Sequence, residues 1–191
     1  MTTQNKNQFT IKHRILHWTI AVLMGVLFLT GFLRMNWMSK KTIINVVSTQ
    51  AKSQNIMFEK EQIIPIAKSI QAPMWEWHEY AAYCMFFAFL FRIIYMLTKG
   101  IRFPMPFAKD QPLNERFQGF TYIIFYLFVA ISIITGAYLK WGNETFKELM
   151  ETVHKWAIYW FPLFMILHLF GIVFGELSKK KGITSKMIGG D

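Results

Sequence analysis

The chain has a single cysteine, Cys84, and this scarcity excludes several kinds of site. One cysteine cannot form an intrachain disulfide, a cysteine-based zinc cluster or an iron–sulfur cluster. It also excludes a haem attached through two thioether bonds, which requires a C-x-x-C-H motif. Because Cys84 lies in the apolar run 81–90, we expect it to be a small buried packing residue. Redox or metal chemistry in this chain must therefore come from other side chains.

Charged residues are scarce as well. Only 17% of the 191 residues are charged, whereas 53% are hydrophobic, which is typical of a membrane protein. About 20 helical residues cross a hydrocarbon core of roughly 30 Å. Four apolar runs have this length, near residues 15–33, 80–97, 120–139 and 156–175. We therefore predict an all-α membrane protein, a four-transmembrane-helix up-down bundle that forms a single domain over residues 1–191.

The connection between the first two spans, residues 34–79, is long and polar. Apolar residues recur in it near Ile43 and Val47 and again near Ile63 and Ile70. This pattern predicts short amphipathic helices that lie on the outer membrane surface. Pro73 is expected near the first turn of the second span, because a helix start tolerates its missing amide hydrogen.

The net charge of +10 is distributed between the spans and at the chain ends, so it does not indicate nucleic-acid binding. Cytoplasmic flanks of membrane helices carry an excess of Lys and Arg. The N-terminal arm, residues 92–116 and the tail after Gly175 together hold twelve basic and four acidic residues. Residues 34–79 and 140–155 together hold nine basic and seven acidic residues. We therefore expect both termini to be cytoplasmic.

All five histidines lie in or at the edge of a predicted span. His13 and His17 belong to the first span, His78 to the second, and His154 and His168 to the fourth. An isolated histidine in a helix is more often a hydrogen-bonded packing residue than a ligand, but ionisable residues inside a membrane are usually functional. On one continuous helix, His154 and His168 would lie about 21 Å apart along the axis and about 40° apart around it. The fourth helix would then present one histidine near each membrane surface.

Up–down topology gives each histidine of the fourth helix a partner at matching depth. His17 pairs with His168 on the inner side, and His78 pairs with His154 on the outer side. A six-coordinate haem iron takes two axial ligands from facing helices, and neutral imidazole suits it. Two haems held in this way would form a transmembrane electron path. His13, one turn before His17, is the alternative ligand on the first helix, and its other role is that of an interfacial side chain.

Three motifs make the sequence resemble a known family. They are R-I-L-H-W at residues 14–18, W-x-W-H-x-Y at residues 75–80, and the H-x13-H spacing of His154 and His168. They resemble the bacterial cytochrome b561 family, which is related to the b-type cytochrome subunits of nickel hydrogenases and formate dehydrogenases. The resemblance implies two b-type haems whose iron is bound by His17, His78, His154 and His168. The long connection 34–79 departs from the compact members of that family.

The resemblance also implies a function and a location. It implies a multi-pass protein of the bacterial inner membrane that transfers electrons between a membrane quinone and an outer-face donor or acceptor. That outer partner is superoxide or another small reductant, or a partner redox protein, and an oxidoreductase activity linked to quinone is compatible with this pattern. The remaining partners are membrane lipid and, as an open question, a second copy of the chain. No flavin, nucleotide or iron–sulfur motif is present for oxidising a soluble dinucleotide.

Other functions stay open. One is the membrane subunit of a larger hydrogenase- or dehydrogenase-type complex. Another is a haem-free membrane adaptor or assembly factor, whose histidines pack structurally or bind a divalent metal. A transporter is disfavoured, because proton and solute pathways usually use Asp or Glu within the spans, and residues 15–33 and 120–139 contain neither.

Overall fold

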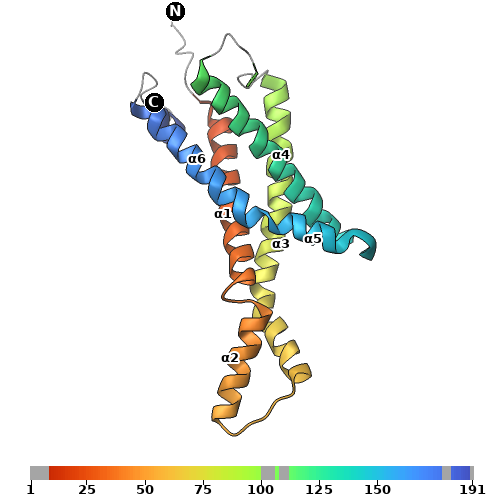
Figure 1. Cartoon of the computed structure of the whole chain (residues 1–191). Helices are drawn as coiled ribbons and strands as arrows, with labels where there is room; N and C mark the ends of the chain where they lie inside the picture. Colours follow the sequence, from red (N-terminus) through yellow and green to blue (C-terminus); the bar gives the residue numbers. More distant parts are fainter. Residues whose placement is uncertain (1–8, 100–105, 108–111, 178–181, 190–191) are drawn as a thin grey trace, which may run out of the picture. The chain divides into compact units, whose positions relative to one another are not determined.

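The structure is a computed structural model that describes residues 9–99, 106–107, 112–177 and 182–189, and these form helices and turns without a strand (Figure 1). The elements are α1 (Ile11–Met35), α2 (Lys40–Ser53), α3 (Lys60–Lys99), α4 (Leu113–Trp141), the 3-10 helix η1 (Glu144–Phe146), α5 (Lys147–Lys155), α6 (Ala157–Leu177) and α7 (Ile183–Ile188). The predicted all-α class therefore holds for the described residues.

Four helical segments are long and apolar enough to cross a membrane. They are Ile11–Met35, Lys60–Lys99, Glu115–Trp141 and Glu144–Leu177. At most 17% of the residues in the most apolar window of each segment are buried within the protein. Apolar helices that leave most of their surface uncovered are unfavourable in water and suit a lipid environment. The prediction of four spans is confirmed at this level.

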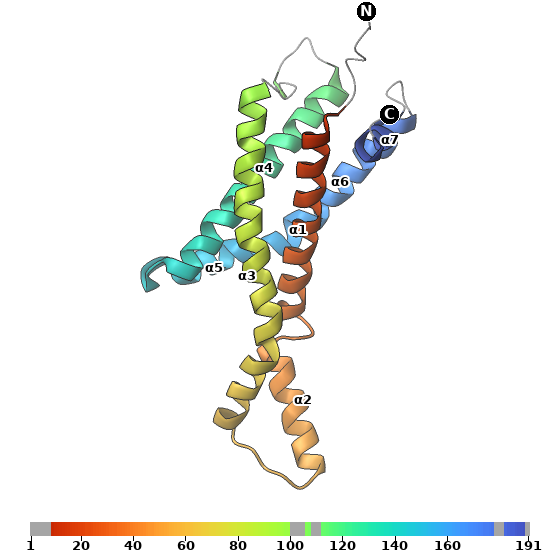
Figure 2. The same cartoon turned by 180° about the vertical axis from the view of Figure 1, so that it is seen from behind.

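The chain divides into two compact units, one comprising residues 1–21 and 86–191 and the other residues 22–85. In the first unit, α4 packs along α5 and α6 (Figures 1 and 2). Aromatic pairs join α4 to α6, because Phe125 stacks on Phe164 at 4.4 Å and Phe128 stacks on Trp160 at 5.4 Å between ring centroids. That the whole chain acts as one membrane domain stays a prediction.

The second unit contains the long connection between the first two spans. Its one separate helix is α2, whose first turn is capped by the Ser39 hydroxyl, which accepts a hydrogen bond from Thr42 N at 3.2 Å. The other apolar segment, around Ile63 and Ile70, does not form a short helix of its own. It is the N-terminal part of α3 (Figure 1). The expectation of several short helices is therefore corrected to one, and its position on the membrane surface stays a prediction.

Helix α3 also starts earlier than Pro73 predicts, because both Pro65 and Pro73 lie inside it. A proline within a helix removes one hydrogen bond and clashes with the preceding turn. Here Ile63, Ala67 and Gln71 recur every fourth residue and are 1%, 0% and 6% exposed, so one continuous face of the helix is buried. The Gln71 amide also donates to the Met38 carbonyl oxygen. Burial and this tertiary hydrogen bond offset the cost of proline.

The fourth span is interrupted at Trp156, which separates α5 from α6. His154 therefore lies on α5 and His168 on α6, and the estimate of their spacing along one straight helix does not apply. Two features weaken the helix at this point. Aromatic and β-branched residues are frequent in residues 153–160. In addition, Pro162 cannot donate a hydrogen bond to the carbonyl four residues earlier.

Cys84 is exposed, so the expectation that it is buried is wrong. It lies beside a buried stripe of α3 that includes Ala81 and Met85, which are 6% and 2% exposed. A helix that is apolar on all sides does not reveal from its sequence which side packs against protein and which faces lipid. The local apolar run was therefore insufficient to place this side chain.

The buried face of α3 predicts unequal effects of two similar substitutions. Ile63→Ala should lower the free energy of unfolding by about 2–5 kcal/mol, because it removes a fully buried side chain. Ile66→Ala, three residues later, should change it by less than about 0.5 kcal/mol, because Ile66 is 39% exposed. Hydrogen exchange of residues 40–72 in detergent measures the difference. Equal protection in the two variants would show that this face is not the buried one.

Candidate functional site

His17 on α1 and His168 on α6 face each other within the first unit. Their ring centroids are 6.1 Å apart and their planes are inclined by 42°. Both rings are partly buried and held by aromatic neighbours: Phe164 stacks on His168 at 5.5 Å, and Trp18 contacts His17 edge-on at 5.6 Å. The structure thus brings together the two histidines that the sequence predicts as the inner pair.

The spacing of this pair fits a shared metal-bound group. A metal–imidazole bond of about 2 Å on each side of an iron, plus about 1 Å from each nitrogen to its ring centre, separates two axial imidazoles by about 6 Å. Among the described residues, no group of three or more His, Cys, Asp or Glu side chains is placed to hold a metal ion. Two facing imidazoles supply the number of ligands that a haem iron takes in addition to its four porphyrin nitrogens.

His13 has different neighbours. Its ring stacks on Phe9 at 5.0 Å and meets the edge of Tyr95 at 6.2 Å. Its Nε2 atom is 3.4 Å from Nη2 of Arg92. Among the described contacts His168 is thus paired with His17, and this geometry supports His17 as the ligand on α1.

Two arginines near the inner pair each have one buried nitrogen atom, Nε of Arg14 and Nη1 of Arg92. Neither nitrogen donates a hydrogen bond to a described residue. Arg92 donates through Nε to the Tyr126 hydroxyl at 3.0 Å, which fixes its guanidinium. A buried donor without an acceptor is unfavourable, and a cationic donor favours a carboxylate. Arg14 lies one helical turn from His17. These two atoms therefore fit the carboxylate side chains of a haem bound at the inner pair.

His78 and His154 are held by the same kind of hydrogen bond. The Nδ1 atom of His78 is 2.7 Å from Oγ1 of Thr30, and Nδ1 of His154 is 3.0 Å from Oγ1 of Thr135. Each threonine hydroxyl donates to the carbonyl four residues earlier at 2.7 Å, so it accepts from the histidine. A proton on Nδ1 places the imidazole lone pair on Nε2, the tautomer of a metal-binding histidine.

Gly136 lets His154 approach α4 closely. A Cβ atom at this position would lie 3.1 Å from Cε1 of the His154 ring. The Nδ1 atom of the same ring is also 3.1 Å from the Ser132 carbonyl oxygen. In the dipeptide Thr135-Gly136, the threonine therefore hydrogen-bonds His154 and the glycine leaves space for its ring. The sequence repeats this dipeptide at residues 30–31, where Thr30 bonds His78.

The outer histidines lie in different units, His78 in the second and His154 in the first. Their pairing as ligands of one haem therefore stays a prediction. Within the second unit, Trp75 stacks on His78 at 5.0 Å with nearly parallel planes. The W-x-W-H motif thus places an indole ring against the face of a predicted ligand.

The C-terminal helix α7 packs beside the inner pair. Arg14 donates through Nη1 to the Ile188 carbonyl at 2.9 Å, and Trp18 donates through Nε1 to the Met187 carbonyl at 3.3 Å. These contacts join α7 to the turns of α1 on either side of His17. Within the first unit, they place both ends of the described chain on the same side.

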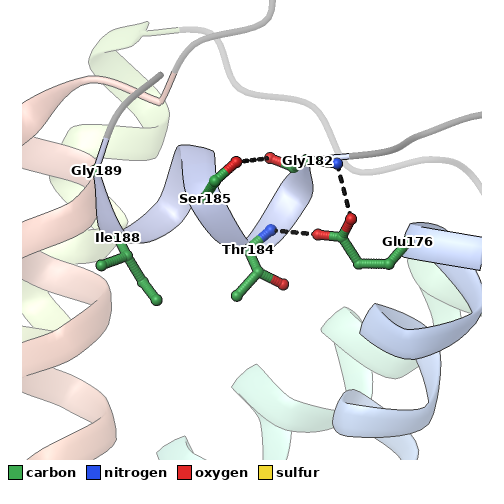
Figure 3. A pocket seen from close by; sticks show the side chains of 6 residues that line it. All are labelled: Glu176, Gly182, Thr184, Ser185, Ile188 and Gly189. Atoms are coloured by element: carbon green, nitrogen blue, oxygen red, sulfur yellow. Dashed lines mark hydrogen bonds between the residues drawn. The ribbon is translucent and has the colours of Figure 1, made fainter.

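A carboxylate of α6 anchors the start of α7. The Glu176 side chain accepts hydrogen bonds from Gly182 N at 2.7 Å and Thr184 N at 2.6 Å, as Figure 3 shows. The cavity beside it, of about 560 Å³, is open and is lined by Glu176, Gly182, Thr184, Ser185, Ile188 and Gly189. This contact was not predictable from the sequence, in which Glu176 and the tail after it are recognisable only as charged residues. The roles of Thr30 and Thr135 were signalled only by the repeated dipeptide.

A family model described as prokaryotic cytochrome b561 matches residues 8–190 of the chain. The matched region includes all five histidines and all described helices. The comparisons with curated proteins and with solved structures gave no match.

The close approach of His154 to Gly136 predicts opposite effects for two glycine substitutions. Gly136→Ala should lower the free energy of unfolding by about 1 kcal/mol, because overpacking against the ring outweighs the gain in helix propensity. Gly171→Ala on α6 should raise that of the haem-free protein by about 0.5–1 kcal/mol, because the added Cβ meets no described atom within 4 Å. Thermal unfolding in detergent measures both values. A stabilised Gly136→Ala protein would contradict the described position of His154.

Proposed function

The chain belongs to the prokaryotic cytochrome b561 family, and we propose that it holds two b-type haems, each between two of its own histidines. Members of this family transfer electrons across the membrane through b-type haem. With its four apolar helical segments, this chain is a multi-pass bacterial membrane protein. The bound haem iron supplies one-electron redox chemistry, and the protein supplies ligation, orientation and electrostatics.

The inner haem is assigned to His17 and His168. The observation that carries this assignment is their ring separation of 6.1 Å across two helices. Arg14 and Arg92 would bind the haem carboxylates through their buried nitrogen atoms. Phe164 and Trp18 contact the two imidazole rings and restrict their orientation. The orientation of its ligands and the surroundings of the site influence the reduction potential of a haem.

The outer haem is assigned to His78 and His154. What supports this pair is that both rings donate through Nδ1 to a threonine hydroxyl. The same device recurs on α1 and on α4, and it fixes the tautomer that binds iron through Nε2. Each of these two expected ligands is thus held by a threonine of its own unit, and the two units use the same kind of hydrogen bond.

The electron partners we propose are a membrane quinone and an outer-face donor or acceptor. The outer partner is superoxide, another small reductant or a redox protein, and the direction of flow depends on its potential. The orientation we propose places both termini in the cytoplasm. It is supported by the excess of basic residues on the flanks of that side and by the contact of α7 with the first turns of α1.

Single histidine substitutions test the ligand assignment. His17→Ala and His168→Ala should each remove the same haem, and His78→Ala and His154→Ala should each remove the other. In every case the pyridine haemochrome assay should fall from two haems per chain to one. His13→Ala is the matched control on α1 and should retain both haems. If His13→Ala lost a haem and His17→Ala kept both, the inner ligand would be His13.

The threonine bonds generate a second test. Thr135→Val should increase the rate of transfer of one haem to apomyoglobin by about 10–100-fold, because loss of such an outer bond weakens ligand binding by that amount. Thr121→Val is the matched control, since Thr121 lies on the same helix and bonds its own preceding turn, the Phe117 carbonyl, at 2.9 Å. Equal transfer rates in the two variants would show that Thr135 does not support the ligand.

A further inference from the structure

A column of three stacked side chains covers one face of His78. The Cζ atom of Arg34 is 4.1 Å from the centroid of the Trp75 ring. The Trp75 ring lies 5.0 Å from the His78 ring, and the two planes differ by only 3°. All three residues belong to the second unit, so the column is described within one compact part of the chain.

The column forms because two helices each present two suitable side chains on successive turns. Thr30 and Arg34 are four residues apart on α1, and Trp75 and His78 are three residues apart on α3. Residues at these spacings lie on the same face of a helix. Thr30 bonds the edge of His78 at 2.7 Å, and Arg34 caps the indole that covers its face. The Thr30 hydrogen bond therefore fixes the direction in which Nδ1 of the imidazole points. The stacked Trp75 ring fixes the tilt of the imidazole plane.

Trp75 differs from the neighbouring tryptophan of the same motif. Trp77 is 68% exposed, as expected for a side chain at the membrane–water interface. Trp75 is partly buried and stands between a cation and an imidazole. A guanidinium over an indole face is a favourable cation–π pair, which fixes the indole as well as the arginine. An interfacial anchoring role therefore explains Trp77 and leaves the position of Trp75 unexplained.

We propose that Arg34 and Trp75 are positioning residues for the outer haem ligand: Trp75 sets the plane of the His78 imidazole, and the Arg34 charge raises the reduction potential of the haem that His78 holds. This inference rests on the proposed role of His78 as a ligand. Reduction removes one positive charge from the iron centre. A nearby fixed cation therefore disfavours the oxidised form and favours the reduced one.

The size of the effect follows from distance and exposure. The two spacings in the structure, 4.1 Å and 5.0 Å, place the guanidinium within about 9 Å of the His78 ring centre. At about 10 Å and an effective dielectric constant of about 20, one charge changes an equilibrium constant by roughly tenfold. Arg34 is exposed, so solvent and salt reduce this value. We expect a three- to tenfold effect on the reduction equilibrium, where tenfold corresponds to about 59 mV for one electron.

The experiment is a spectroelectrochemical titration of both haems, together with the low-spin electron paramagnetic resonance signal, in five variants of the full chain. Arg34→Gln should shift the reduction equilibrium of one haem three- to tenfold toward the oxidised form. Arg34→Lys should retain most of the wild-type potential, because the charge stays. Trp75→Leu should change the resonance signal of the same haem, since the imidazole plane is released, and Trp75→Phe should restore it. Trp77→Leu is the matched control and should leave both readouts unchanged.

The outcomes separate this inference from the proposed function. If His78→Ala keeps both haems, the ligand assignment is wrong. If His78→Ala loses one haem, but Arg34→Gln and Trp75→Leu keep the wild-type potentials and resonance signals, the positioning role is wrong and the ligand assignment stands. Equal changes of the resonance signal in Trp75→Leu and Trp77→Leu would also overturn the positioning role. Should Trp75→Leu fail to fold, the comparison of Arg34→Gln with Arg34→Lys decides.

Discussion

The structure depends on one constraint: an imidazole placed within a membrane helix needs a partner for each of its polar nitrogens, because the surrounding hydrocarbon offers none. Threonine hydroxyls accept from Nδ1 of the two outer histidines, and Nε2 of His13 lies 3.4 Å from an arginine nitrogen. His17 instead faces the ring of His168 at 6.1 Å. Fixed, neutral imidazoles on different helices are what a bis-histidine haem protein needs from its polypeptide.

The residues that support the histidines lie next to them or on short neighbouring segments. A threonine accepts from Nδ1 while donating to its own helix, so one hydroxyl satisfies both the backbone and the ligand. On α4, Gly136 follows this threonine and leaves room for the His154 ring of α5. Beside the His17–His168 pair, α7 bonds the turns of α1 around His17, and Glu176 fixes the start of α7. The site thus depends on short segments that join the ends of the spans, and not on a large buried core.

Much of this was predictable from the sequence. Long apolar runs fix the four spans, and the resemblance to cytochrome b561 is confirmed by the match over residues 8–190. The structure places His17 beside His168, although their role as ligands remains a prediction. The exceptions have physical causes. Helix α3 continues through Pro73 because tertiary burial stabilises it. The fourth span is interrupted at Trp156, where helix propensity is low. The exposure of Cys84 was not predictable because the apolar pattern of α3 does not distinguish its buried side from its exposed side. The docking of α7 depends on backbone carbonyls, which carry no sequence signal.

The central claim is that this one chain holds two b-type haems, each ligated by two histidines. The most direct measurement is haem per polypeptide in the detergent-purified protein, by pyridine haemochrome, combined with the reduced-minus-oxidised visible spectrum. The account predicts two b-type haems per chain, both with six-coordinate, low-spin bands. One haem per chain, or a high-spin spectrum after expression with adequate haem, would contradict it.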